Sequence, residues 1–173
     1  MNFTIPALTT ERLTLRAPDI GDFEAFAQFR NSDRAKFVGG PYSRAQAFDQ
    51  LAEVIGHWVL RGYGRWMVAD KQTDQPLGIV GLFYPDDWPE PEISWSVFEA
   101  GEGKGIAYEA AIASRAYAYD TLGWRTAISC IDSENTRSVA LGKRMGAVYE
   151  SDFDHPTLGA MKVWRHPAPE SAS

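Results

Sequence analysis

Three glycines and a lysine fall within five residues, Gly101, Gly103, Lys104 and Gly105, between a predicted strand and a predicted helix. A glycine backbone can take a positive φ and can approach a ligand closely, because it carries no Cβ. The helix that follows begins with unpaired N–H groups and the positive end of its dipole, and Lys104 adds a full positive charge. The pattern predicts a binding loop for an anion, most naturally the phosphates of a cofactor.

The spacing of these glycines disfavours two common phosphate-binding loops. A dinucleotide-binding Gly-x-Gly-x-x-Gly needs glycine at position 106 or 108, where Ile106 and Tyr108 stand. A P-loop needs a Gly-Lys-Ser/Thr sequence after four residues, which is absent. Taken alone, the loop is equally compatible with a tight strand-to-helix turn that binds nothing.

A second stretch with chemical potential covers residues 132–147. Asn135 and Ser138 lie three residues apart, so a helix would place both side chains on one face. An ordinary helix with Ser133 as its N-cap and Gly146 after its last turn is the alternative.

Together, the two stretches resemble the GNAT superfamily of N-acetyltransferases. The acetyl-CoA loop pattern of that family, Arg/Gln-x-x-Gly-x-Gly/Ala, falls on residues 102–107, with Glu102 where Arg or Gln is usual. The continuation from Tyr108 looks like the ribosomal-protein-alanine, or RimJ/RimL-type, branch. The later stretch resembles the family's Asn-x-x-Ser/Ala element, and the resemblance extends from about Thr10 to Trp164.

The resemblance implies an α/β (α+β) fold in a single domain over residues 1–166, followed by a flexible tail at 167–173. Its central sheet is expected to be mixed and mostly antiparallel, with about six to seven strands and about four flanking helices, and to be splayed between strands 4 and 5. The implied activity is transfer of an acetyl group from acetyl-CoA to a primary amine, of a protein N-terminus or a small molecule, by direct attack. The alternative is a catalytically weak acyl-CoA-binding regulatory module, which the unusual Glu102 keeps open. Turnover with acetyl-CoA separates the two.

The cofactor site expected from this reading combines a strand, a loop and a helix. An extended pantetheine chain would pair with the strand at 92–97, while the pyrophosphate rests on the glycine loop. The expected cofactor-binding residues are Trp95, Ser96, Val97, Gly103, Lys104, Gly105, Ile106, Ala107, Tyr108, Asn135 and Ser138. Ser138 is also the candidate acid for the departing thiolate, because Gly142 stands where the family commonly has a tyrosine.

Glu92 is the candidate general base, since a carboxylate beside apolar Ile93 and Trp95 can accept a proton from an ammonium group. A solvated glutamate at a strand edge is the alternative. The expected contacts with the acceptor are Arg30, Asn31, Tyr42 and Trp88, each with a surface or packing role as its alternative.

No metal site is expected, because His57, His155 and His166 have no metal-ligand spacing with one another or with Cys130. Cys130 is expected to be a buried strand residue.

The elements that must position these residues follow from hydrophobic periodicity. Alternation predicts strands at 12–18, 65–70, 76–84, 92–97, 125–131, 148–153 and 160–164. Helical spacing predicts helices that start after Asp19, after the capping box of Ser43 and Gln46, near Ala107 and after Ser133. In the second helix, Phe48 and Trp58 are predicted to be core residues.

Composition bounds the function. A chain of 173 residues with 45% hydrophobic residues can form one domain with a sizeable core, and it has no apolar run long enough to span a bilayer. The single cysteine cannot form an intrachain disulfide and the first residues do not resemble a signal peptide, so a cytoplasmic location away from membranes is expected. A net charge of −6 and a pI near 5.1 argue against nucleic-acid binding and mildly favour cationic substrates, unless the charge serves solubility alone. A homodimer is left open.

Overall fold

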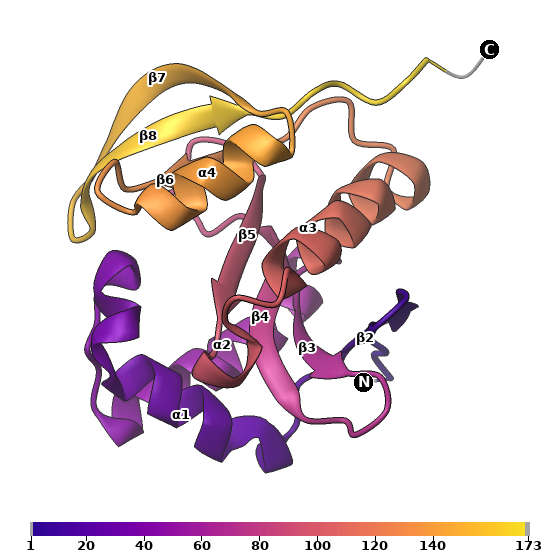
Figure 1. The fold of residues 1–173 in the computed structure, drawn as a ribbon, viewed down its shortest axis with the longest axis vertical. Helices are drawn as coiled ribbons and strands as arrows, with labels where there is room; N and C mark the ends of the chain where they lie inside the picture. Colours follow the sequence, from indigo (N-terminus) through magenta and orange to yellow (C-terminus); the bar gives the residue numbers. More distant parts are fainter. Residues whose placement is uncertain (1, 172–173) are drawn as a thin grey trace.

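The computed structural model describes residues 2–171 and contains one eight-stranded sheet with the strand order β1-β2-β3-β4-β5-β6-β8-β7 (Figure 1). The strands are β1 (Leu8–Thr9), β2 (Leu13–Arg16), β3 (Arg65–Asp70), β4 (Pro76–Phe83), β5 (Glu92–Val97), β6 (Ile128–Ile131), β7 (Val148–His155) and β8 (Gly159–Arg165). Every neighbouring pair is antiparallel except β5 and β6, which are parallel. The mixed, mostly antiparallel sheet predicted from the sequence is confirmed.

Within the same range of residues, four α-helices flank the sheet: α1 (Phe23–Asn31), α2 (Arg44–Arg61), α3 (Ile106–Ala116) and α4 (Thr136–Arg144). Short 3-10 turns cover Ile20–Asp22, Asp33–Val38 and Glu99–Gly101, and α3 continues into a π-helical turn, Tyr117–Thr121. The capping box predicted at the start of α2 is present, with Ser43 and Gln46 each accepting a hydrogen bond from the other's backbone N–H. None of the helices within residues 2–171 is long and apolar enough to cross a membrane.

The sheet has one strand more than the sequence predicts. β1 is only two residues long and pairs with β2 through Leu8 and Leu15, so it is too short to show an alternating pattern. Because β1 precedes the others, the splay expected between the fourth and fifth strands lies between β5 and β6 in the numbering of Figure 1. The flexible tail at 167–173 stays a prediction, and its last two residues lie outside the described part of the chain.

The two faces of the sheet carry different helices. α3 packs on one face through Ala110 and Ala111, which are fully buried, while α1 and α2 pack on the other (Figure 1). Trp58 of α2 is 1% exposed, as predicted for a core residue. The prediction for Phe48 is wrong: this side chain is 50% exposed, and its ring packs edge-to-face with the Phe23 ring at a centroid distance of 5.5 Å.

β5 and β6 separate after a single register pair, Glu92 with Ile128. Beyond this point two side chains take over the hydrogen bonds that a continued ladder would make. The hydroxyl of Ser129 donates to the carbonyl of Ile93 over 2.6 Å, and the N–H of Cys130 donates to the Glu92 carboxyl over 2.7 Å. The splay therefore opens a cleft without leaving these buried backbone groups unpaired.

A buried chain of hydrogen bonds supports this junction from behind. Arg115 of α3 donates to Nδ1 of His166, and Nε2 of His166 lies 2.9 Å from the Ser129 hydroxyl. Burial, together with the charge of Arg115, lowers the pKa of His166 to about 3, so the ring is neutral and can serve as acceptor on one side and donor on the other. The position of the Ser129 hydroxyl at the splay is thereby tied to α3.

Candidate active site

The glycine loop has the backbone geometry that its composition predicts. Gly103 and Gly105 have φ values of +71° and +74°, a region that residues with a side chain rarely adopt. Gly105 is the residue that precedes α3, so the first-turn N–H groups of Ile106 and Ala107 have no acceptor within the helix. Gly101 serves packing instead, because a Cβ there would lie 2.8 Å from the carbonyl oxygen of Leu77.

A cavity of about 620 Å³, named here the cofactor cleft, lies between β5, this loop, α4 and the turn at 33–38. All of the residues predicted to bind the cofactor line it except Lys104. The Lys104 side chain is exposed, and its Nζ donates to the carbonyl of Ala100 over 2.8 Å. The lysine therefore closes its own turn and does not point into the cleft.

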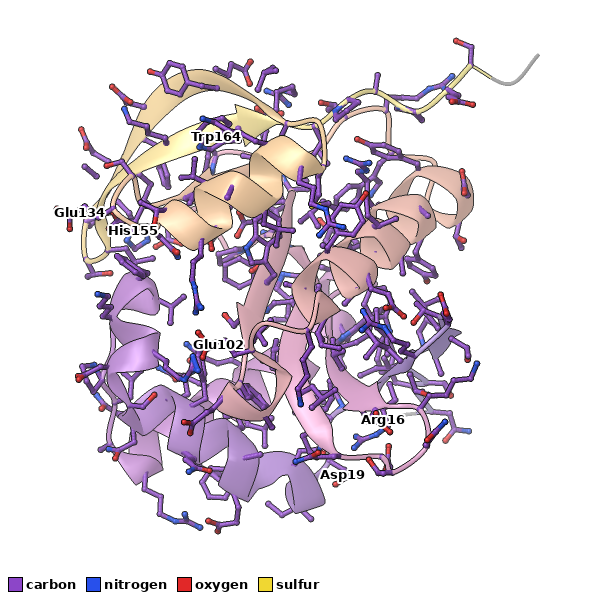
Figure 2. The ribbon with its side chains drawn as sticks, viewed as in Figure 1. Arg16, Asp19, Glu102, Glu134, His155 and Trp164 are labelled. Atoms are coloured by element: carbon purple, nitrogen blue, oxygen red, sulfur yellow. The ribbon has the colours of Figure 1, made fainter. Side chains whose placement is uncertain are left out.

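Arginines that the sequence analysis missed supply positive charge to the cofactor cleft. Glu102 forms ion pairs with both Arg34 and Arg137, so two guanidinium groups are held around one carboxylate. Figure 2 shows Glu102 between α4 and the helical region at the start of the chain. Arg144 lies 3.9 Å above the Tyr108 ring and also lines the cleft. The carboxylate of Glu102 is thus more than offset locally, and the loop remains suited to an anion.

Asn135 and Ser138 lie together at the inner end of the cofactor cleft. Asn135 caps α4 by accepting a hydrogen bond from the N–H of Ser138 over 3.2 Å, which leaves its side-chain NH2 as a donor. The Ser138 hydroxyl accepts from the indole N–H of Trp95 over 3.1 Å. This contact spans the splay from β5 to α4 and leaves the hydroxyl proton of Ser138 available for donation.

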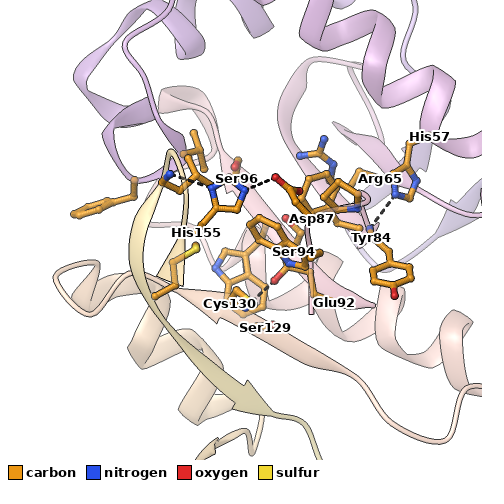
Figure 3. Close-up of a pocket in the computed structure, with 18 of the residues that line it drawn as sticks. His57, Arg65, Tyr84, Asp87, Glu92, Ser94, Ser96, Ser129, Cys130 and His155 are labelled. Carbon is orange, nitrogen blue, oxygen red and sulfur yellow. Dashed lines mark hydrogen bonds and ion pairs between the residues drawn. The ribbon is translucent and has the colours of Figure 1, made fainter. Parts of the chain in front are cut away.

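A second cavity, of about 680 Å³ and named here the acceptor pocket, adjoins the first; Figure 3 shows residues that line it. Arg30, Tyr42 and Trp88 line it, as expected for contacts with an acceptor. Asn31 does not line it: the side chain is exposed and donates to the Tyr42 carbonyl over 2.9 Å, so it supports the adjacent turn. The two cavities share the residues Phe37, Val38, Trp95, Ser96, Asn135 and Ser138.

Glu92 lines the acceptor pocket and is only 4% exposed, which excludes the solvated strand-edge alternative. Burial raises the pKa of Glu92 to about 8, against the opposing effects of the Cys130 N–H and the charge of Arg65. The carboxyl group is therefore largely protonated at neutral pH and ionises just above it. A group with this pKa can exchange a proton with an amine near physiological pH.

Two histidines help to build the acceptor pocket without acting as free bases. Nε2 of His155 lies 2.6 Å from the Asp87 carboxylate, and its Nδ1 accepts from the N–H of Leu158 over 3.0 Å. This contact ties the end of β7 to the loop after β4, as Figure 3 shows. His57 is engaged in the same way, with Nδ1 donating to the Tyr63 carbonyl and Nε2 accepting from the Tyr84 N–H. In both histidines, each ring nitrogen already has a polar partner within the protein.

Cys130 lines the acceptor pocket beside Glu92 but is not a nucleophile at neutral pH. Burial and the nearby charges of Glu92 and Glu90 raise the pKa of the Cys130 thiol well above its ordinary value. No group of three or more His, Cys, Asp or Glu within residues 2–171 is arranged to hold a metal ion.

Comparison with known proteins fits this arrangement of loop, splay and paired cavities. The family model of the acetyltransferase (GNAT) domain matches residues 12–148, which is most of the chain. The protein belongs to the GNAT family of acetyltransferases. Acetyl transfer is the general chemistry of GNAT enzymes, and acetyl-CoA is their general acetyl donor.

Individual GNAT relatives share a moderate or low fraction of identical residues with this chain. The uncharacterized N-acetyltransferase p20 of Bacillus licheniformis is 27% identical over 138 residues, which is 78% of each chain. The crystal structure of an acetyltransferase from Agrobacterium tumefaciens superposes with a TM-score of 0.86 and 33% identity, covering 96% of this chain and 97% of that one. The ribosomal-protein-S5-alanine acetyltransferase of Vibrio fischeri superposes with a TM-score of 0.72 at 13% identity, over 96% of this chain and 98% of that one. At that identity the likeness extends to the fold alone and does not distinguish the RimJ/RimL branch from other GNAT enzymes.

Proposed function

We propose that the protein is an acetyl-CoA-dependent N-acetyltransferase that acts on a primary amine by direct attack. The observation that carries the proposal is that the cofactor cleft and the acceptor pocket meet at the splay, where Trp95, Ser96, Asn135 and Ser138 line both. A donor bound along one cavity and an amine bound in the other would reach each other without a covalent intermediate on the protein.

The residues of the cofactor cleft fit acetyl-CoA, which supplies the activated acetyl group when bound. The first-turn N–H groups of α3, with Arg34, Arg137 and Arg144, are suited to the phosphates. The edge of β5 beyond Ile93 is unpaired on the side of β6, so it can bind an extended amide chain as a partner strand would. The side-chain NH2 of Asn135, which the helix cap leaves unused, would donate to one of those amides.

Two residues carry out the two proton transfers of the proposed reaction. Glu92, in its ionised form, takes the proton of the attacking amine, directly or through water. Ser138 would pass a proton to the leaving sulfur and recover one from water, while the Trp95 indole keeps the hydroxyl oxygen in place. Backbone N–H groups of β5 at the splay are suited to stabilise the negative charge that develops on the acetyl oxygen.

The acceptor class within this proposal includes protein N-termini and small amines. The loop sequence that continues into Tyr108 supports a RimJ/RimL-type enzyme, whose acceptors are protein N-termini. A cytoplasmic location also stays a prediction. A homodimer stays a prediction as well, and sedimentation equilibrium tests it.

A screen of amine acceptors for CoA release tests the proposal. Amino acids, peptides with free N-termini and polyamines are incubated with acetyl-CoA, and released CoA is measured with a thiol reagent. We expect turnover with at least one class of amine and none with the corresponding N-acetylated compounds. Tight acetyl-CoA binding without turnover of any amine would favour the regulatory acyl-CoA-binding module instead.

A further inference from the structure

Arg30 is buried at the edge of the acceptor pocket with no ion-pair partner. Its side chain is 6% exposed, lines the pocket, and has an Nε atom without any hydrogen-bond partner. Its guanidinium carbon lies 5.0 Å from the centre of the Phe26 ring and 5.8 Å from those of Phe29 and Tyr42. Within residues 2–171, no carboxylate lies within ion-pair distance of it.

Arg65 brings a second positive charge into the same pocket. It begins β3, and the sheet register places it opposite Gly81 of β4, which in turn lies opposite Ser94 of β5. Because Gly81 has no side chain, the Arg65 side chain can lie across β4 toward β5, and its guanidinium carbon is 4.2 Å from the centre of the Phe83 ring. In the described part of the chain, Arg65 likewise has no acidic group within ion-pair distance and no side-chain hydrogen bond.

Arg30 is buried and Arg65 is partly buried, and two such cations without counterions are costly unless an anion joins them. Burial lowers the pKa of Arg30 and of Arg65, and the charge of Arg30 lowers that of Arg65 further. The nearby acids do not compensate fully. Glu92 is largely protonated at neutral pH, and Glu53 is exposed on α2 and forms no ion pair with either arginine.

Resting on the proposed function, we propose that the acceptor amine carries an anionic oxyacid group, which Arg30 and Arg65 bind while the amine faces Glu92. Guanidinium groups bind carboxylates and phosphonates through paired, charge-assisted hydrogen bonds, so either anion fits this chemistry. Arg65 and Ser94 are two strands apart, about 10 Å between Cα atoms, so one small molecule can span the arginines and the strand that carries Glu92. Within the acceptors of the proposed function, this inference selects a small zwitterion such as an amino acid over the protein N-terminus that the RimJ/RimL resemblance implies, despite the net negative charge of the whole chain.

Matched acceptors test this inference directly. The panel contains α-amino acids and ω-amino acids, their carboxamides, and aminoalkylphosphonates of the same chain lengths, each assayed for kcat/KM by CoA release. We expect at least one carboxylate or phosphonate to exceed its uncharged partner by tenfold or more. The carboxylate and phosphonate arms identify which anion is preferred.

Arginine variants locate the anion site. Arg65→Met and Arg30→Met should each lower kcat/KM for the anionic acceptor at least tenfold, mainly through KM, and should remove its advantage over the carboxamide. The control is Arg44→Met, on the outer side of α2, where Arg44 pairs with Glu24 away from both cavities; it should keep activity and preference. Arg30 is buried, so Arg30→Met can lose stability for reasons unrelated to the acceptor. Arg65→Met is therefore the variant that tests the anion site. An acetyl-CoA-induced thermal shift in this variant shows that it is folded.

The outcomes separate this inference from the proposed function. Equal kcat/KM for acids and carboxamides, an unchanged preference in Arg65→Met, or turnover restricted to uncharged amines overturns the inference and leaves the acetyltransferase standing. Acetyl-CoA binding without turnover of any anionic amine overturns it too. Absence of both an acetyl-CoA-induced thermal shift and CoA release from every amine overturns the proposed function itself.

Discussion

The cofactor cleft and the acceptor pocket are built in different ways. The cleft is lined mainly by four short stretches, 33–38, 95–97, 101–108 and 135–144. Many of its binding groups are backbone groups: glycines with positive φ, the first turn of α3 and the edge of β5. The acceptor pocket collects side chains from α1, α2, β3, the end of β4 and the loop after it, β5, β6 and the turn between β7 and β8. A site made of local backbone is encoded locally, whereas a site made of distant side chains depends on the whole fold.

The two regions also differ in how they treat charge. The arginines around the cofactor cleft pair with Glu102 near the surface, where water screens them. In the acceptor pocket, Glu92 and Arg30 are buried and Arg65 is partly buried, and burial shifts the pKa values of all three. Cofactor variants should therefore change binding, and acceptor variants should change the pH dependence of the reaction.

The largest effect is expected from Gly105→Val. A valine Cβ at a φ of +74° is strained, and its side chain would stand at the mouth of the α3 N-terminus, so acetyl-CoA should no longer raise the melting temperature. The control is Gly123→Val, because Gly123 has a φ of +72°, lies outside the cleft, and would place a Cβ with no neighbouring atom within 4 Å. Both variants should lose on the order of 1–2 kcal/mol of stability, and only Gly105→Val should lose the ligand response. An intact response in Gly105→Val would show that the phosphates bind elsewhere.

The second effect concerns Glu92, the central residue of the acceptor side. Glu92→Gln keeps an acceptor for the Cys130 N–H but cannot take a proton, so kcat/KM should fall by about 10²-fold above pH 8. The ratio of wild-type to variant kcat/KM should rise tenfold per pH unit up to about pH 8 and stay constant above it, because the pKa of Glu92 is about 8. The ionisation of the amine affects both enzymes equally and cancels in the ratio. Glu90→Gln, which removes a partner of Arg165 outside the pocket, should leave the ratio flat. A flat ratio for Glu92→Gln would remove Glu92 from the mechanism.

The same carboxyl group predicts a pH dependence of stability. The folded-state pKa of Glu92 lies above its unfolded value of about 4.5, so its contribution is fully present below pH 4.5 and is lost as pH rises through about 8. From pH 5 to pH 9 the wild type should therefore lose more melting temperature than Glu92→Gln. Parallel melting curves across this range would mean that Glu92 is not buried as described.

A smaller effect is expected at the junction of the two regions. Ser138→Ala removes the hydroxyl that donates toward the leaving sulfur and should lower kcat by about tenfold across the pH range, since a thiolate is a fair leaving group. Trp95→Phe keeps the hydroxyl but removes the indole N–H that holds it, so its loss should be smaller. A loss confined to one end of the pH range would assign Ser138 a different role.

The smallest effect belongs to Glu102. Replacing it with Gln frees Arg34 and Arg137 for the phosphates and should tighten CoA binding by about fivefold, or ~1 kcal/mol. Glu99→Gln, in the preceding turn and exposed, is the control and should leave affinity unchanged. Calorimetric titration with CoA measures both; weaker binding in Glu102→Gln would mean that Glu102 orients the arginines and does not compete with the ligand.

The sequence predicted the fold and the cofactor cleft well because their signals are local. Glycine spacing marks the loop. The helix predicted to start after Ser133 is present as α4, although its N-cap is Asn135 and not Ser133. Arg34, Arg65 and His155 carry no such signal, since each gains its surroundings only when distant segments meet. Lys104 and Asn31 were predicted to bind the cofactor and the acceptor because they are next to binding residues in the sequence. Their side chains instead donate to neighbouring backbone carbonyls and do not line the cavities.

Whether the two cavities form one active site can be decided by a crystal structure of the protein with bound CoA. We expect the pyrophosphate at the N–H groups of Ile106 and Ala107, the pantetheine along the edge of β5, and the sulfur beside Ser138, facing the pocket that holds Glu92. CoA phosphates bound away from the glycine loop, or a sulfur that does not reach Ser138, would contradict a single site.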